Sequence, residues 1–148
     1  MNFKHFSLDP RILAGVRAMG YTTPTPIQEQ AIPVVLKGRD VLGIAQTGTG
    51  KTAAFILPIL HNLLQNRGSR RRVRVLILAP TRELAEQTHE VARELGRKTG
   101  VRSVSIYGGV GKGPQIQALR RGAEIVVACP GRLLDLHRQG QIDLSHVE

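Results

Sequence analysis

The chain has 148 residues, the length of one ordinary domain. Hydrophobic residues make up 41% and aromatic residues only 3%, so Val, Ile, Leu and Ala must fill the core, and this composition argues against disorder. The formal net charge of +10 gives a surface that attracts phosphate groups. Both a nucleic-acid-binding protein and a merely basic soluble protein fit that charge.

The sequence also argues against membrane association. No apolar run approaches the ~18 residues that a membrane helix needs. The N-terminal segment MNFKHFSLDP lacks the apolar core of a signal peptide. The single cysteine, Cys129, cannot form an internal disulfide, which fits a reducing compartment. We therefore expect a cytoplasmic protein.

In chain order, residues 9–19 carry apolar side chains at helical spacing, and Gly20 is placed to end that helix. Residues 24–38 begin as a second helix, which Pro33 kinks or breaks. From residue 41 on, predicted strands alternate with predicted helices. Buried strands are predicted at 41–45, 73–79, 101–107 and 124–129, and helices at about 50–66, 82–99, 113–122 and 130–140.

This alternation predicts an α/β fold, with a parallel sheet and helices on both of its faces. Ligands of such sheets bind at the carboxyl ends of the strands. The loops at 46–50, 80–82, 108–113 and 130–132 should all lie on that edge. The basic tract at 67–74 is interpreted as a solvated surface loop.

The segment AQTGTGKT, residues 45–52, lies between a predicted strand and a predicted helix, as a phosphate-binding loop requires. Gly48 and Gly50 let the backbone fold around an anion, and the helix N-terminus adds the positive end of its dipole. Lys51 would reach the outer phosphates, and the Thr52 hydroxyl would ligate Mg²⁺. The general pattern begins with Gly, where this sequence has Ala45. A chance Gly/Thr turn is the alternative.

The segment GYTTPTPIQ, residues 20–28, offers groups that could recognise a base. The Gln28 amide can donate and accept at once, so it can pair with the N6/N7 edge of adenine. Tyr21 offers a stacking face. Taken separately, Gln28 as a helix cap and Tyr21 as a core residue are the better interpretations.

Five segments occur in a characteristic order: GYTTPTPIQ, AQTGTGKT, APTRELAEQ, YGG and CPGR. Together they resemble the DEAD-box family of ATP-dependent RNA helicases, bacterial members in particular. The resemblance covers essentially the whole chain and matches the first of the family's two RecA-like domains. It implies ATP and Mg²⁺ as cofactors and RNA as the partner.

The resemblance also implies roles for individual residues. In the family, the glutamine motif recognises adenine, so Gln28 would contact the base edge, Tyr21 would stack on the ring and Phe3 would support the motif. The phosphates would be held by Thr47, Gly48, Thr49, Gly50, Lys51 and Thr52. The residues implied to contact RNA are Pro80, Thr81, Arg82, Gly108, Gly109, Pro130, Gly131 and Arg132.

These RNA contacts would address the backbone, which predicts little sequence preference and strong salt dependence. Ordinary helix-start chemistry for Arg82 and Glu83, and a plain turn at Gly108 and Gly109, are the alternatives. Cys129 stands where the family motif has Thr. Because a thiol is a poor hydrogen-bond donor, the phosphate contact of that threonine is not expected here.

The resemblance divides the chain into a helical region with the glutamine motif, residues 1–38, and a partial RecA-like ATP-binding domain, residues 39–148. The chain stops before the Asp-Glu-Ala-Asp motif and the second domain of the family. We therefore expect an N-terminal piece of a longer helicase that binds ATP but hydrolyses it negligibly alone. A non-catalytic ATP- and RNA-binding clamp, or a different phosphate-loop ATPase, is the alternative.

The same resemblance places two further strands beside the strand at 41–45. Without them, that strand would be an exposed apolar edge. We therefore expect the isolated chain to be marginally stable or to self-associate.

Overall fold

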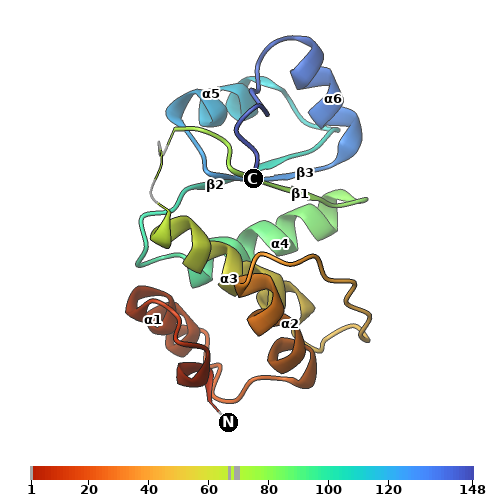
Figure 1. Ribbon diagram of the computed structural model, residues 1–148. Helices are drawn as coiled ribbons and strands as arrows, with labels where there is room; N and C mark the ends of the chain where they lie inside the picture. The colour runs from red at the N-terminus through yellow and green to blue at the C-terminus, as the bar shows by residue number, and fades with distance from the viewer. Residues whose placement is uncertain (1, 67, 69–70) are drawn as a thin grey trace. The chain divides into compact units, whose positions relative to one another are not determined.

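The computed structural model describes residues 2–66, 68 and 71–148, which form two compact units (Figure 1). The first unit comprises residues 1–67 and 94–100, and the second comprises residues 68–93 and 101–148. Part of the basic tract predicted as a surface loop at 67–74 lies outside the described residues. The predicted boundary between residues 38 and 39 stays a prediction.

The first unit is helical. It contains the short 3-10 helix η1 (Phe3–Phe6) and the helices α1 (Pro10–Ala18), α2 (Pro26–Leu36) and α3 (Lys51–Gln65). Helices α2 and α3 pack together, and Pro33 lies inside α2 without ending it. The fully buried side chains that form this core are Ile12, Val16, Ile32, Ile56, Leu57, Leu60 and Leu95.

Asp9 fixes the start of α1. Its Oδ1 accepts hydrogen bonds from the Arg11 backbone N–H and from Arg11 Nε, both at 2.9 Å, and its Oδ2 pairs with Arg11 Nη2 at 2.8 Å. The Asp9 backbone N–H donates to Nδ1 of His61 in α3 at 3.1 Å. One residue therefore caps α1 and ties it to α3.

The second unit is an α/β layer. It contains β1 (Val75–Leu78), α4 (Arg82–Leu95, whose last two residues belong to the first unit), β2 (Ser103–Ile106), α5 (Gly113–Arg121), β3 (Ile125–Ala128) and α6 (Pro130–Arg138). The strands form a parallel three-stranded sheet in the order β1-β3-β2, with Ile125 of β3 opposite Val75 and Ser103. Helix α4 lies on one face of this sheet, and α5 and α6 lie on the other (Figure 1). The predicted parallel α/β architecture is confirmed.

Every second side chain of β3 packs on the face of the sheet that α5 and α6 cover. Val126 and Ala128 of β3 and Ile106 of β2 point into this layer, as the period of two in a strand requires. They pack against buried Leu133 and Leu136 of α6. All four residues of β3 are buried because it is the central strand.

The prediction of a buried strand at 41–45 is wrong. Residues 39–46 are irregular, and the side chains of Leu42 and Ile44 are 88% and 85% exposed. Among the described residues, no strand pairs with this segment, and an apolar run cannot stay extended without a partner for its backbone groups. The strand predicted as fully buried at 73–79 is a half-buried edge strand, with Leu78 exposed.

Within the described part of the chain, no helix is long and apolar enough to cross a membrane.

The carboxylate of Asp9 should make stability depend on pH. Its hydrogen bond with the Arg11 side chain lowers the pKa of Asp9 from 3.8 to about 2. A carboxylate with a lowered pKa stabilises the fold above its unfolded pKa, and this contribution is lost as the pH falls through the folded pKa. Asp9→Asn keeps a good helix cap but removes the charge. It should lower the free energy of unfolding near neutral pH by about 1–2 kcal/mol.

Denaturant unfolding at a series of pH values measures this difference, which should shrink below about pH 4 and be lost only below about pH 2. The exposed Asp40 provides the matched control, because Asp40→Asn removes an equal charge. A pH-independent gap between wild type and Asp9→Asn would show that the ion pair contributes nothing.

Candidate functional site

The loop before α3 has the backbone of an anion-binding site. Gly48 and Gly50 both have φ of +82°, in the left-handed region that glycine adopts without strain. Gly50 is the N-cap of α3, and no side chain among the described residues caps this helix start. The first backbone N–H groups of α3 therefore point toward the loop without a capping partner, where they can bind an anion together with the helix dipole.

Lysine and threonine side chains of this loop bond back to its own backbone. Lys51 Nζ donates to the carbonyl of Ala45, and Thr49 Oγ1 donates to the carbonyl of Gln46, both at 2.6 Å. The ammonium of Lys51 is thereby held at the beginning of the loop. Thr52, the predicted Mg²⁺ ligand, is half-buried in the first turn of α3, and Thr47 is exposed.

Gln28 joins helix α2 to this loop. Its side chain is 3% exposed, and its Oε1 accepts from the Thr25 backbone N–H at 3.0 Å as part of a capping box. Its Nε2 donates to the carbonyl of Gly50 at 3.2 Å. The capping interpretation of Gln28 is therefore confirmed. One N–H and one oxygen lone pair of the amide stay uncommitted, and contact with adenine stays a prediction.

The rings of Tyr21 and Phe3 lie against each other, and the roles implied for them at adenine stay predictions. Their rings are stacked, with centroids 6.3 Å apart and planes 24° apart. Phe3 is buried and Tyr21 is half-buried, so Phe3 supports the ring of Tyr21 from the protein side. Within this unit, the structure therefore brings together Phe3 with Tyr21, and Gln28 with the phosphate loop.

The contact between Gln28 and Gly50 leaves no room for a side chain on Gly50. A Cβ there would lie 2.3 Å from Nε2 of Gln28, whereas a Cβ on Gly48 would meet nothing within 4 Å. Both glycines have the same φ, so an alanine at either position costs about 1–2 kcal/mol of backbone strain. Gly50→Ala should cost about 1 kcal/mol more, because the end of the Gln28 side chain must shift and give up its hydrogen bond to the Gly50 carbonyl.

Thermal or denaturant unfolding of Gly48→Ala and Gly50→Ala, compared with wild type, checks this expectation. Gly48→Ala is the matched control for the strain. Equal losses in the two variants would mean that the Gln28 contact contributes nothing to the fold.

In the second unit, the remaining predicted site residues follow the carboxyl ends of the three parallel strands. Residues 80–82 follow β1, residues 108–113 follow β2 and residues 130–132 follow β3. Because the strands are parallel and in register, these three loops share one edge of the sheet, as predicted for them. That the loop at 46–50 lies on the same edge stays a prediction. Gly109 has φ of +80°, and a Cβ on Gly108 or Gly109 would meet nothing within 4 Å. The glycine turn is therefore open to an approaching backbone.

Arg82 lies over an aromatic ring at this edge. Its guanidinium carbon is 4.9 Å from the ring centroid of Tyr107, a cation–π contact. The hydroxyl of Tyr107 donates a hydrogen bond to the carboxylate of Glu86. That hydrogen bond, and the Glu86 charge that accompanies it, raise the pKa of Tyr107. Sequence analysis singled out Arg82 but assigned no role to Tyr107 or Glu86.

Arg132 is held by two acceptors. Its Nη2 donates to the carbonyl of Val110 at 2.9 Å, and its Nη1 donates to Oε1 of Gln115 at 3.3 Å. Gln115 in turn donates through Nε2 to the carbonyl of Tyr107 at 2.9 Å. The sequence gives no signal for Gln115, because nothing in one sequence separates a buried glutamine of a surface helix from an exposed one.

Cys129 caps α6 only with its backbone. It occupies the N-cap position, and its side chain makes no capping hydrogen bond. Its backbone N–H donates to the carbonyl of Ile106 at 2.8 Å, which fixes the end of β3 against β2. Pro130 and Gly131 then form the first turn of α6. The N–H groups of this turn, rather than a side chain at position 129, are what an anion would meet.

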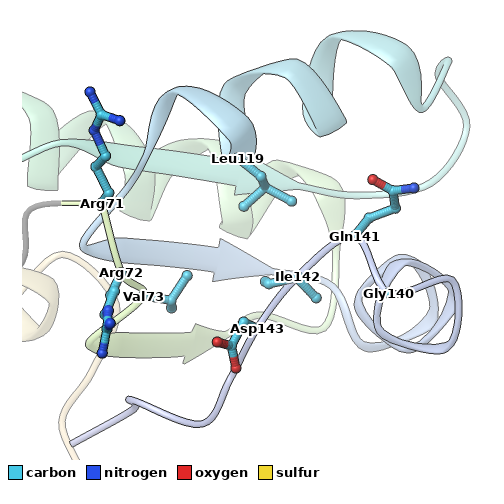
Figure 2. Close-up of a pocket in the computed structure, with 8 residues that line it drawn as sticks. All are labelled: Arg71, Arg72, Val73, Leu119, Gly140, Gln141, Ile142 and Asp143. Carbon is cyan, nitrogen blue, oxygen red and sulfur yellow. The ribbon is translucent and has the colours of Figure 1, made fainter.

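A separate hollow lies on the second unit (Figure 2). Its volume is about 240 Å³, below the ~300–1,000 Å³ of typical ligand pockets. Val73, Leu119 and Ile142 lie in the middle of the view, with the charged side chains around them (Figure 2). It is lined by Arg71, Arg72, Val73, Leu119, Gly140, Gln141, Ile142 and Asp143, none of which is a predicted site residue.

Comparison with known proteins identifies close relatives. The family model for DEAD/DEAH box helicases matches residues 25–148. The chain is 54% identical to DEAD-box ATP-dependent RNA helicase 30 of Arabidopsis thaliana over 147 residues, covering 98% of this chain and 25% of that protein. It is 47% identical to the DEAD-box ATP-dependent RNA helicase CshA of Streptococcus pneumoniae over 148 residues, covering 100% of this chain and 28% of that protein.

Solved structures show the same fold. The RNA helicase Prp28 from Chaetomium thermophilum bound to ADP matches with a TM-score of 0.89 and 44% identity, over 99% of this chain and 36% of that chain. A DEAD box protein from Methanococcus jannaschii matches with a TM-score of 0.89 and 38% identity, over 100% of this chain and 40% of that chain. The chain spans about a quarter of the length of the curated relatives that it matches.

Proposed function

Because the chain belongs to the DEAD/DEAH box helicase family, we propose that it supplies the first nucleotide- and RNA-binding part of an ATP-dependent RNA helicase. The observation that supports this most directly is the hydrogen bond from Gln28 Nε2 to the carbonyl of Gly50. It couples the residue proposed to recognise the base to the loop proposed to hold the phosphates.

In this proposal the nucleotide is ATP, with Mg²⁺. Its phosphates bind the N–H groups of the loop and of the start of α3, and Lys51 exchanges the Ala45 carbonyl for the outer phosphates. Tyr21 stacks on adenine, Phe3 supports that ring, and the free part of the Gln28 amide contacts the base edge.

The residues present fit the metal only in part. Thr52 offers one hydroxyl, and the described residues include no group of three or more His, Cys, Asp or Glu side chains that could hold an ion. Mg²⁺ commonly keeps several waters and binds substrate phosphates, so one hydroxyl from this chain is compatible with its coordination. When bound, Mg²⁺ neutralises charge that develops on the phosphates.

The RNA contacts of the proposal lie on the carboxyl edge of the second unit. Arg82 and Arg132 supply positive charge there, and Gly108 and Gly109 let the RNA backbone approach. Pro80, Thr81, Pro130 and Gly131 shape the helix starts on either side. Because these groups address phosphate and sugar, binding should show little sequence preference. In the whole protein, ATP binding and hydrolysis would drive the unwinding or remodelling of RNA in the cytoplasm.

Calorimetric titration with ADP and with GDP, both with Mg²⁺, tests the nucleotide site. ADP should bind and GDP should not, because the free donor and acceptor of the Gln28 amide match the adenine edge. Lys51→Ala should abolish detectable ADP binding, since it removes the cation nearest the phosphates. Lys37→Ala, which removes an exposed lysine at the end of α2, is the matched control and should bind as wild type does. Equal affinity for ADP and GDP would refute the role of Gln28, and unchanged affinity in Lys51→Ala would refute the loop.

We also propose that copies of the isolated chain associate through the exposed apolar segment at 41–44. Sedimentation velocity over a range of concentrations should show dimers or larger species, and Leu42→Asp should reduce them. A wild-type chain that stays monomeric at high concentration contradicts the proposal.

A further inference from the structure

Gln115 is a buried amide that bonds to two different loops. It lies in the first turn of α5, and only 8% of it is exposed. Its Nε2 donates to the carbonyl of Tyr107, and its Oε1 accepts from Nη1 of Arg132. A carbonyl requires a donor and a guanidinium requires an acceptor, so only one orientation of the amide satisfies both partners. Both ends of the side chain are therefore committed.

The contacts of Arg132 leave part of its guanidinium available. A guanidinium has five N–H donors, and the hydrogen bonds to Gln115 and to the carbonyl of Val110 use two of them. Two acceptors on a planar group fix its plane as well as its position. The remaining donors of Arg132 thus point in a set direction at the half-exposed surface.

Tyr107, the second partner of Gln115, contacts Arg82, the other arginine at this edge of the sheet. Its ring lies under the Arg82 guanidinium, and its hydroxyl is held by Glu86. Gln115 fixes the backbone from which that ring projects. One buried amide therefore links Arg132, which follows β3, to the residue on which Arg82, which follows β1, is stacked.

We propose that Gln115 is a positioning residue for RNA binding, which fixes Arg132 and the Tyr107 turn so that two arginines meet the phosphodiester backbone of one RNA strand. The proposal rests on the RNA-binding function proposed above. A free arginine loses much rotamer freedom when it binds a phosphate, and an arginine already fixed in the protein loses less. Removal of Gln115 should therefore weaken RNA binding although Gln115 itself touches no RNA.

The fold around Gln115 has other supports. Lys112 Nζ pairs with Asp135 Oδ2 at 2.5 Å, which joins α5 to α6 independently of Gln115. Ile116 and Leu119 of α5 pack against the hydrophobic core of the second unit. A change at Gln115 should therefore leave both helices in place, so that an effect on RNA binding can be measured on a folded protein.

The test compares Gln115→Met with Gln117→Met in the full-length protein. Gln117 lies on the same helix but is exposed, so its variant is the matched control. The probe is single-stranded homopolymeric RNA, titrated at several salt concentrations, with ADP affinity measured in parallel. Gln115→Met should weaken RNA binding severalfold, Gln117→Met should not, and ADP affinity should stay unchanged in both.

A double-mutant cycle separates positioning from a general structural effect. Arg132→Ala should lower the steepness of the salt dependence by about one phosphate contact. If Gln115 acts in part through Arg132, Gln115→Met should have a smaller effect on RNA affinity in the Arg132→Ala background than in wild type, and the effect that remains reflects the Tyr107 turn. Equal effects in the two backgrounds would overturn the proposal.

Gln115→Glu keeps the test decisive if the Met variant does not fold. Glutamate keeps the size of the side chain and the acceptor for Arg132, but it loses the donor to the Tyr107 carbonyl and offsets the charge of Arg132. RNA binding should weaken, and binding equal to wild type would overturn the proposal. A wild-type protein that binds ADP but not RNA would refute RNA binding itself, whereas normal RNA binding in the Gln115 variants would refute only the positioning role.

Discussion

The second unit depends on the pairing of β3 with a parallel strand on each side. Its backbone groups bond to β1 and β2, and its side chains are buried on both faces, so it has one register with each neighbour. Because all three strands run in the same direction, the segments that follow them meet at one edge. Arg82, Tyr107 and Arg132 are far apart in the chain, and this pairing is what brings them together.

A buried glutamine has the same structural role in each unit. Gln28 links the start of α2 to the loop before α3, and Gln115 links the start of α5 to the turn after β2 and to Arg132. An amide suits this position because it donates and accepts at once and carries no charge that burial would penalise. In both units, a segment rich in glycine is thus contacted by a buried glutamine from a neighbouring helix, and the loop before α3 also bonds to its own Lys51 and Thr49 side chains.

At residues 41–45, the structure differs from the strand that the local hydrophobic pattern predicts. The apolar residues of this segment are typical of a buried strand, yet its backbone is irregular and Leu42 and Ile44 are exposed. A strand is stable only when its N–H and C=O groups find partners, and the described sheet ends at β1 and β2. Periodicity reports which side chains suit a core, whereas partners for the backbone come from other segments of the fold.

The sequence by itself determined the α-helices α1 to α6, three of the four predicted strands and the parallel α/β class, because hydrophobic period, glycine placement and helix caps act over a few residues. That residues 45–52 bind phosphate stays a prediction. Only the tertiary structure decided that Gln28 bonds to Gly50, that Arg82 lies on Tyr107, and that Gln115 holds Arg132. Each of these contacts joins residues from different elements, so it depends on strand order and helix packing. No local sequence pattern predicts which residues of different elements make such a contact.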